Sequence, residues 1–298
     1  MQDALEIQTT AIDSGSLIPA KHHFNCAIHP WGDRYVLAYR IEDEPFNERT
    51  RTAICELDGN LRPLSGTNKL LDLPTIHGLL IAEDPRLISI EGRLHCCYTD
   101  RGRTALARLS CELTVDAARY IRYTADVGIQ KNWAIFEHDS RVYAVHTICP
   151  HRILELDLQF SMEHTATLRH ESDYSSRWSW GQPRGGTPPV RVGDEYFCFF
   201  HSHYHCPKDP GRIYVMGAYS FEACPPFKVT RLTRLPLLQA PQLPMTERAA
   251  NGHLVVFPCG AIHDAESWLV SYGENDMWCK LCKFKHDDLL GLMDPVKM

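Results

Sequence analysis

Five similar units of two β-strands joined by a tight turn recur along the chain, and this repetition constrains the fold more than any other feature. In each unit, a run rich in β-branched and aromatic residues is followed by a turn with glycine or aspartate and by a second such run. The units cover residues 24–41, 84–100, 132–148, 187–202 and 255–273. Further β-like stretches lie between them at residues 51–58, 105–111 and 212–221. This spacing predicts about four strands per unit.

Five units of this kind predict an all-β protein, a five-bladed β-propeller. A propeller arranges its sheets around one axis and keeps their edges short. A β-sandwich with long loops also accounts for the strands, but it does not explain why a polar segment followed by a hairpin recurs. We expect one propeller domain over residues 1–298, with its core at about residues 22–286. The terminal segments are expected to be tails, closing strands or contacts between subunits.

The composition limits the partners that the chain can bind. Its net charge is −6, and 44% of its 298 residues are hydrophobic. The chain therefore lacks the excess of basic residues through which proteins bind nucleic acids or membrane surfaces. Residues 1–15 have no basic and apolar regions of a secretory signal, and no apolar run approaches the roughly 18 residues of a membrane helix. The twelve cysteines are then expected to be reduced thiols. We expect a cytoplasmic protein, whose oligomeric state the sequence does not define.

The residues at which the five units begin differ from the core of a strand, because they are polar, glycine-rich or next to proline. They are Asn25, Glu83 and Asp84, Lys131 and Asn132, Gly185 to Thr187, and Phe257 to Cys259. Strands that enter a propeller from the same end gather such starts around its axis. We therefore expect groups that are far apart in the sequence to line one central funnel.

Short motifs surround these starts and occur in one order along the chain. They are Glu83-Asp84-Pro85-Arg86, Lys131-Asn132-Trp133, Gly185-Gly186-Thr187-Pro188-Pro189-Val190, Val256-Phe257-Pro258-Cys259-Gly260 and the segment 270–276. With this set the chain resembles glycoside hydrolase family 130, the β-mannoside phosphorylases and related mannosyltransferases, from about residue 25 to residue 276. One motif is weak evidence, whereas five in order are specific. The resemblance implies a five-bladed propeller with a central sugar site.

Asp84 is the candidate catalytic residue. The resemblance implies that the aspartate before Pro85 and Arg86 is the general acid of an inverting reaction. The residues alone also support this role, because burial in an enclosed polar site raises the pKa of a carboxyl and lets it donate a proton. In many proteins, however, an aspartate before proline only caps a turn.

Phosphate binding needs cations and amide donors, whereas an inverting hydrolase needs a second carboxylate to activate water. The candidates for phosphate binding are Arg51 (or Arg49 in its place), Lys131, Asn132, Arg191 and His201. The resembling phosphorylases have an Arg-Asn pair at the position of Lys131 and Asn132, and a lysine at that of Arg191. The charge is kept, but a guanidinium binds phosphate as a fork and an ammonium as a point.

Sugar contacts are expected from polar residues and aromatic rings around the funnel. The candidates for substrate binding are Asn25, Glu83, Arg86, His151 and Asp276. Asp276 matches an aspartate that binds mannose hydroxyls in the family, and His151 is a candidate for the acceptor or phosphate side. Trp133, Trp178 and Trp180 are suited to stack on sugar faces or to fill the core.

Two patterns are compatible with a metal ion, but neither leads us to expect one. Cys279 and Cys282 have zinc-like spacing, but positions three apart on a strand point to opposite faces. His201, His203 and His205 would share one face of a continued strand, and the alternative is a rim loop that contributes His201 to the site.

We therefore expect an inverting glycoside phosphorylase that transfers mannosyl groups of β-mannosides to or from phosphate. Its partners would be a small carbohydrate and inorganic phosphate as co-substrate, with no cofactor. Hydrolysis without phosphate would require a further carboxylate, for which Glu83, Glu137 and Glu274 are candidates. A mannosyltransferase would share Asp84. A propeller that only binds sugar would have no evident use for an acid among converging cations.

Overall fold

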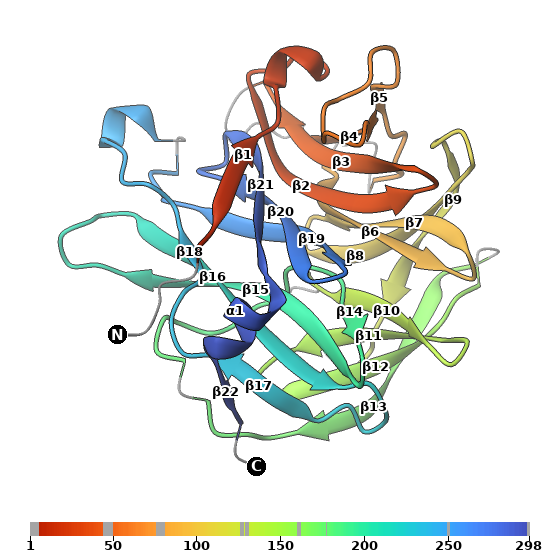
Figure 1. The fold of residues 1–298 in the computed structure, drawn as a ribbon. Coiled ribbons are helices and arrows are strands. Elements are labelled where there is room, and N and C mark those ends of the chain that lie inside the picture. Colours follow the sequence, from red (N-terminus) through yellow and green to blue (C-terminus); the bar gives the residue numbers. More distant parts are fainter. Residues whose placement is uncertain are drawn as a thin grey trace.

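The computed structural model describes residues 6–43, 50–75, 81–125, 128, 131–159, 162–176, 178–248 and 251–296. These residues form β-sheets arranged around a common axis (Figure 1). The described part contains one short α-helix, α1 (His286–Gly291), and the 3-10 turns η1 (Ser14–Ser16) and η3 (Met245–Glu247). No helix among these residues has the length and apolar character required to cross a bilayer.

Five groups of antiparallel strands follow one another along the chain as the blades of a propeller, and a short parallel pairing joins blades 2 and 3 into one eight-stranded sheet. Blade 1 has β2 (His22–Trp31), β3 (Arg34–Glu42), β4 (Arg51–Leu57) and β5 (Lys69–Leu70). Blade 2 has β6 (Glu83–Ile90), β7 (Arg93–Asp100), β8 (Arg103–Leu109) and β9 (Val115–Arg122). Blade 3 has β10 (Ala134–His138), β11 (Arg141–Thr147), β12 (His151–Asp157) and β13 (His164–Ser172).

The last two blades use strands from both ends of the chain. Blade 4 has β14 (Val190–Val192), β15 (Glu195–His205), β16 (Arg212–Glu222), β17 (Val229–Thr233) and, beyond these, β22 (Met293–Pro295). The short strand β18 (Leu238–Gln239) pairs with β16. Blade 5 has β19 (Val256–Asp264), β20 (Ser267–Glu274), β21 (Trp278–Lys285) and β1 (Gln8–Ala11). The terminal segments therefore contribute closing strands.

The strands match the units expected from the sequence. The five expected hairpins are β2–β3, β6–β7, β10–β11, β14–β15 and β19–β20, and the three additional stretches are β4, β8 and β16. The propeller prediction is confirmed. The first strands of neighbouring blades contact one another at the centre, as β2 does with β6 and β19. Because these strands run in the same direction, their starts gather at one end of the axis and their ends at the other.

Apolar side chains fill the space between the blades. The largest cluster of buried residues joins blades 2, 3, 4 and 5 and includes Trp133, Phe136, Phe199, Phe221 and Trp268. Smaller clusters pack blade 1 against blades 2 and 5. These contacts hold the first strands in place around the axis, and the polar residues at their starts are thereby kept in a rigid frame.

Candidate functional site

A cavity of about 420 Å³ opens where the first strands begin. Its lining includes Asn25 from β2, Glu83 and Asp84 from β6, Lys131 before β10, and Phe257 from β19. The fourth start lies next to them, because the carbonyls of Gly185 and Gly186 accept hydrogen bonds from Arg86, the second residue after Asp84. The expected convergence of strand starts is therefore observed.

The backbone at this end is held in the left-handed region at several residues other than glycine. The φ angles are 48° at Asn25, 53° at Asp84, 64° at Asn132 and 54° at Asp276. The strand pairing shifts register at both Asn25 and Asp84, which marks β-bulges. A bulge changes the direction of a side chain, and strained backbone of this kind concentrates at functional sites. The bulges turn Asn25 and Asp84 toward each other.

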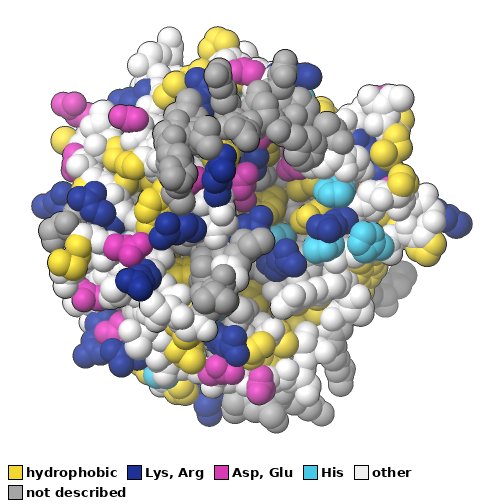
Figure 2. All heavy atoms as spheres, turned by 180° about the vertical axis from the view of Figure 1, so that it is seen from behind, with side chains coloured by type: hydrophobic (Ala, Val, Ile, Leu, Met, Phe, Trp, Pro, Cys, Tyr) yellow, Lys and Arg dark blue, Asp and Glu magenta, His cyan; other side chains and the backbone are white. Residues whose placement is uncertain are grey.

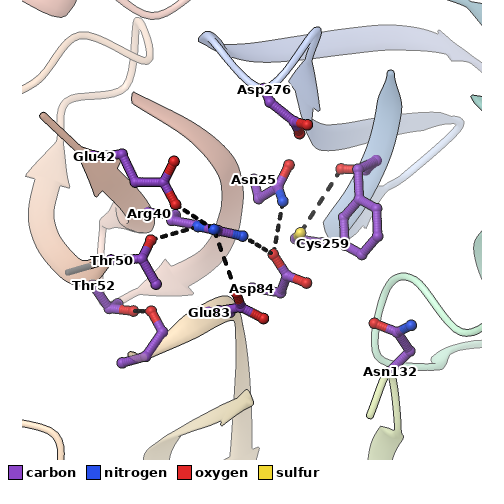
Figure 3. Close-up of polar contacts among 12 residues, drawn as sticks. Asn25, Arg40, Glu42, Thr50, Thr52, Glu83, Asp84, Asn132, Cys259 and Asp276 are labelled. Carbon is purple, nitrogen blue, oxygen red and sulfur yellow. Dashed lines mark hydrogen bonds and ion pairs between the residues drawn. The ribbon is translucent and has the colours of Figure 1, made fainter. Parts of the chain in front are cut away.

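Asp84 is the most enclosed acid of this cavity, with 6% of its surface exposed. Its Oδ1 accepts a hydrogen bond of 2.7 Å from the Asn25 amide and lies 3.5 Å from a guanidinium nitrogen of Arg40. Figure 3 shows the three side chains pointing toward one another from β2, β3 and β6. Close packing fixes Asn25, because a Cβ on Gly273 would lie 2.0 Å from its side-chain oxygen.

Arg40, which sequence reasoning missed, lies at the centre of this charge network. Its guanidinium pairs with Glu42, lies 3.4 Å from Glu83 and donates to the Thr50 hydroxyl at 2.6 Å (Figure 3). It also lies over the ring of Phe24, 4.8 Å from the ring centre. The sequence held one signal for it, a charged residue between Tyr39 and Ile41 in an otherwise apolar run.

Glu83 and Asp84 are adjacent in the chain, but their surroundings shift their pKa values in opposite directions. Burial alone would raise the pKa of Asp84, but Arg40, Arg86 and the Asn25 hydrogen bond outweigh it, so the pKa lies below its ordinary value. Burial raises the pKa of Glu83 and prevails over Arg40. This corrects the raised pKa that we expected for Asp84, because the expectation did not include Arg40.

Asp276 and Glu42 line the same cavity as Asp84. Asp276 accepts a hydrogen bond of 2.8 Å from Asn251, and burial raises the pKa of its carboxyl. Of the three glutamates considered as a second carboxylate, only Glu83 lies here. Glu137 lines a different cavity, and Glu274 is paired with Lys280 at 2.6 Å.

Arg86 and Asn132 lie beside the cavity but do not line it. Arg86 is 1% exposed and donates to the Asp84 carbonyl at 3.0 Å and to the Asn132 side-chain oxygen at 3.2 Å. It thus links the starts of β6 and β10 and the glycines of blade 4. Its contacts are those of a residue that positions the site.

Among the five phosphate candidates, only Lys131 combines a cationic side chain with a place in the lining. His201 is 2% exposed and its ring centre lies 4.2 Å from that of Phe257. Burial, together with the charge of Arg86, holds the pKa of His201 far below its ordinary value. His201 is therefore a neutral residue behind the wall, and the expectation that it is a cation needs correction.

Arg191 and Arg51 are not brought together with Asp84. Arg191 lines a second cavity of about 470 Å³ formed by the far ends of the first strands, and its Nε donates to the Gly193 carbonyl at 3.1 Å. Arg51 lies 3.4 Å from Asp43 and lines a third cavity of about 200 Å³. Arg49 lies outside the described residues.

His151 is a core residue, with 1% of its surface exposed. Its ring packs against Tyr219 and Phe221, and burial lowers its pKa to about 3. Trp133 and Trp178 are also buried in the core. The expectation that His151 contacts the substrate therefore needs correction, because β12 places it between blades 3 and 4.

The patterns compatible with a metal do not form a metal site in the part of the chain described. Cys279 and Cys282 belong to different hydrophobic clusters on opposite faces of β21. No set of three or more His, Cys, Asp or Glu side chains is arranged to hold a metal ion among these residues.

A buried ion pair fixes the rim of the cavity beside blade 4. Arg248 donates to both carboxylate oxygens of Asp209, at 2.6 and 2.7 Å, and to the carbonyls of Leu243 and Gly252. The segment that follows carries Asn251, the partner of Asp276, and His253, which lines the cavity. This clamp, the pair Arg248–Asp209, therefore positions two residues of the site.

Comparisons with known proteins agree with the motifs. The family model of glycoside hydrolase family 130, described as β-1,4-mannooligosaccharide phosphorylase, matches residues 179–295. The curated β-1,2-mannobiose phosphorylase of Listeria innocua serovar 6a is 26% identical over 221 residues, which are 70% of this chain and 59% of that protein. The chain thus matches less than two thirds of the length of this relative.

Solved structures show the same fold. One describes family 130 hydrolases that target β-1,2 mannosidic linkages in Candida mannan, with a TM-score of 0.70, 13% identity and 95% of each chain covered. The Listeria innocua β-1,2-mannobiose phosphorylase in complex with β-1,2-mannobiose has a TM-score of 0.61, 16% identity and coverage of 95% of this chain and 93% of that one. MPT-1, a GDP-Man-dependent mannosyltransferase from Leishmania mexicana, has a TM-score of 0.61, 13% identity and coverage of 95% and 90%.

Proposed function

Because the chain is related to glycoside hydrolase family 130, we propose that it transfers a mannosyl group between a β-mannoside and inorganic phosphate at the cavity around Asp84. The observation that carries the proposal is the enclosed Asp84 carboxylate, held by Asn25 and Arg40 on a bulge at the start of β6. Such a group is suited to move one proton at a fixed point of a bound sugar.

The proposed reaction is a single displacement with inversion. In phosphorolysis, a phosphate oxygen forms a bond to the anomeric carbon as the bond to the leaving oxygen breaks, and Asp84 supplies the proton for that oxygen. In synthesis, the Asp84 carboxylate takes the proton from the acceptor hydroxyl while phosphate leaves from the opposite face. The lowered pKa of Asp84 supports the synthetic direction, because it favours the carboxylate that accepts the proton.

The sugar would be held by the acidic half of the cavity. Asn25, Glu42 and Asp276 line it with amide and carboxylate groups, which suit the hydroxyls of a neutral hexose. Phosphate would be held on the side of Lys131, the exposed cation of the lining, with Asn132 next to it in the chain. Arg51, Arg191 and His201 have no part in this proposal, because they lie in other cavities or in the wall.

The proposal is tested by incubating the protein with mannose 1-phosphate and a panel of acceptor sugars. We expect release of inorganic phosphate and its loss in the variant Asp84→Asn. Arg191→Gln in the second cavity is the control and should keep the activity. No release over a broad panel, together with equal behaviour of wild type and Asp84→Asn toward mannosides, would overturn the proposal.

Hydrolysis without phosphate is the second candidate, because Glu83 and Glu42 supply further carboxylates in the same cavity. An inverting hydrolase uses a second carboxylate to activate water. Turnover of β-mannosides that does not depend on phosphate and is lost in Glu83→Gln would favour it. A mannosyltransferase would differ in its activated donor, and a module that only binds sugar would show binding without turnover.

We further propose a cytoplasmic location and no cofactor. All twelve cysteines lie in the described part and are free thiols, as a reducing compartment maintains them. The absence of a cofactor is tested in reaction mixtures that contain only the protein, a mannoside, phosphate and a metal chelator. We expect full activity in them.

A further inference from the structure

The β15–β16 hairpin is longer than its counterparts and extends beside the cavity mouth. Both strands have eleven residues, whereas the second and third strands of the other blades have seven to nine. Their pairing continues to His205 and Arg212 (Figure 1). Tyr214, in register with His203, lines the cavity. The extension therefore supplies one wall of the mouth.

Basic residues gather on this wall: Arg184 forms a backbone bridge with His201 of β15, and His253 lines the cavity. We refer to them as the cationic rim, which consists of Arg184, His203, His205, Arg212 and His253. The His203 ring stacks on Tyr214 at 5.0 Å, and the His205 ring lies 6.3 Å from that of His203. The His253 ring lies 5.9 Å from Tyr214, and its Nδ1 accepts the Arg212 backbone N–H at 3.1 Å. Figure 2 shows histidines gathered with Lys or Arg side chains beside a hollow in which acidic side chains are visible.

The cationic rim has no acidic counterpart among the residues that the structure describes. Neither Arg184 nor Arg212 forms an ion pair there, and the nearby carboxylate of Asp209 is occupied by Arg248. His203 Nδ1 is buried without a hydrogen-bond partner. Burial lowers the pKa values of His203 and His253, so the positive charge of the rim comes from its two arginines. In a chain of net charge −6, two exposed arginines without an acidic partner in the described part are a local excess of positive charge that favours an anionic ligand.

We propose that the cationic rim binds a phosphate monoester on the acceptor sugar, so that the preferred acceptor is a sugar phosphate. This inference rests on the proposed function, because the reacting sugar occupies the cavity of Asp84. The two guanidinium groups bind phosphate oxygens as forks, and the imidazoles add N–H donors. The rim continues the cavity wall through Tyr214 and His253, so one acceptor reaches both places.

The distribution of charge fixes which end of the acceptor lies where. Glu42, Glu83 and Asp276 line the inner part of the cavity and repel an anion, so that part takes hydroxyl groups. The phosphate monoester then points outward to the cationic rim. The inorganic phosphate of the reaction is a separate group on the side of Lys131, and the rim is not needed to hold it.

The test measures binding by calorimetry at low salt, so it does not depend on turnover. The probes are mannose, mannose 6-phosphate and glucuronate, and the variant is Arg184→Gln/Arg212→Gln. Arg191→Gln, which removes an exposed arginine at the other end of the axis, is the matched control. Both rim arginines are exposed and make no ion pair in the described part, so we expect the variant to keep its Tm within about 2 °C.

We expect the wild type and the control to bind mannose 6-phosphate at least about tenfold more tightly than mannose, and the double variant to lose most of this preference while it binds mannose as before. Equal affinity of the two sugars in the wild type overturns the proposal. So does a preference that survives in the double variant, or glucuronate binding as tight as that of mannose 6-phosphate. A normal binding preference without turnover would instead count against the proposed function.

Discussion

The two ends of the propeller axis carry cavities of similar size and different chemistry. The cavity at the strand starts has a volume of about 420 Å³ and that at the strand ends about 470 Å³. The first contains four acids and a buried arginine, Arg40, which contacts three of them, Glu42, Glu83 and Asp84. The second combines apolar residues, such as Leu87, Phe136 and Pro188, with polar groups, several of which are paired with each other, as the His138 ring nitrogens are with Tyr196 and Asp139. Volume alone therefore does not mark the functional end.

Backbone strain distinguishes the two ends in the same way. Asn25 and Asp84 line the first cavity in left-handed conformations that serve no turn of a hairpin, whereas the positive φ of Asp276 belongs to the turn between β20 and β21. Among the lining residues of the second cavity, the one at positive φ is Asp139, which lies in the tight turn between β10 and β11. Strain that local turn geometry does not require is maintained by the surrounding packing, and it points to function.

Removing the acid should have the largest effect on activity. We expect Asp84→Asn to lower kcat by about a thousandfold, because general acid–base catalysis contributes on this scale. Glu137→Gln in the second cavity is the matched change and should leave kcat unchanged. Steady-state kinetics with mannose 1-phosphate measure both, and similar rates for the two variants would show that the comparison of the cavities does not locate the chemistry.

Removing the buried cation should have the largest effect on stability. Arg40→Met leaves Glu42, Glu83 and Asp84 without their counter-charge, and breaking a buried ion pair of this kind costs about 3 to 5 kcal/mol. Arg191→Met should change the free energy of unfolding by less than about 0.5 kcal/mol, because this side chain is exposed. Denaturant unfolding at neutral pH measures both. Equal stability of the two variants would contradict the claim that Arg40 stabilises the fold as the counter-charge of these carboxylates.

Loosening the clamp should have an intermediate effect, confined to the first cavity. Arg248→Lys keeps the charge but loses the fork on Asp209, so we expect kcat/KM to fall about tenfold through a higher KM as Asn251 and His253 shift. Arg234→Lys, which breaks a similar contact with Asp294, is the control and should keep KM. A fall in Tm with unchanged KM would show that the clamp stabilises the fold but does not position the site.

The smallest expected effect is the pH dependence of stability at Glu83. Its pKa is raised in the folded protein, so its contribution to stability is present below its unfolded pKa and is lost as pH rises through the folded value. Glu83→Gln should therefore gain stability relative to the wild type as pH rises from 4 to 8, as thermal unfolding at several pH values will show. Asp84, with a lowered pKa, contributes in the opposite sense, and its stabilisation is lost as pH falls through the folded value.

The fold followed from the sequence because each blade begins with a local signal, a polar start before a hairpin. The gathering of Asn25, Asp84 and Lys131 followed from the shared direction of the first strands. The prediction that Arg191 lies in the same cavity as Asp84 was wrong for a related reason. Arg191 comes four residues after Thr187, and a strand rises about 3.3 Å per residue, so it lies roughly 13 Å further along the axis.

Residues on the second and third strands were beyond such reasoning, because their place depends on pairing register. Arg40 lies opposite Phe24, and this pairing brings it next to Asn25. His151 lies on β12 opposite Ser172, which places it between two blades. Neither register can be deduced from alternation alone, because a shift of one residue reverses the face to which every side chain points.

The strand β1 has a consequence for how this site comes into being. Because β1 pairs with β21, the fifth blade is complete only when chain segments more than 250 residues apart have met. Asn25 packs against Gly273 at the interface between blades 1 and 5. During synthesis, blades 1 to 3 have all their strands before the C-terminal segment emerges, whereas blade 4 is completed by β22 and blade 5 by the pairing of β1 with β21. The cavity around Asp84, which Phe257 and Asp276 also line, is therefore completed late.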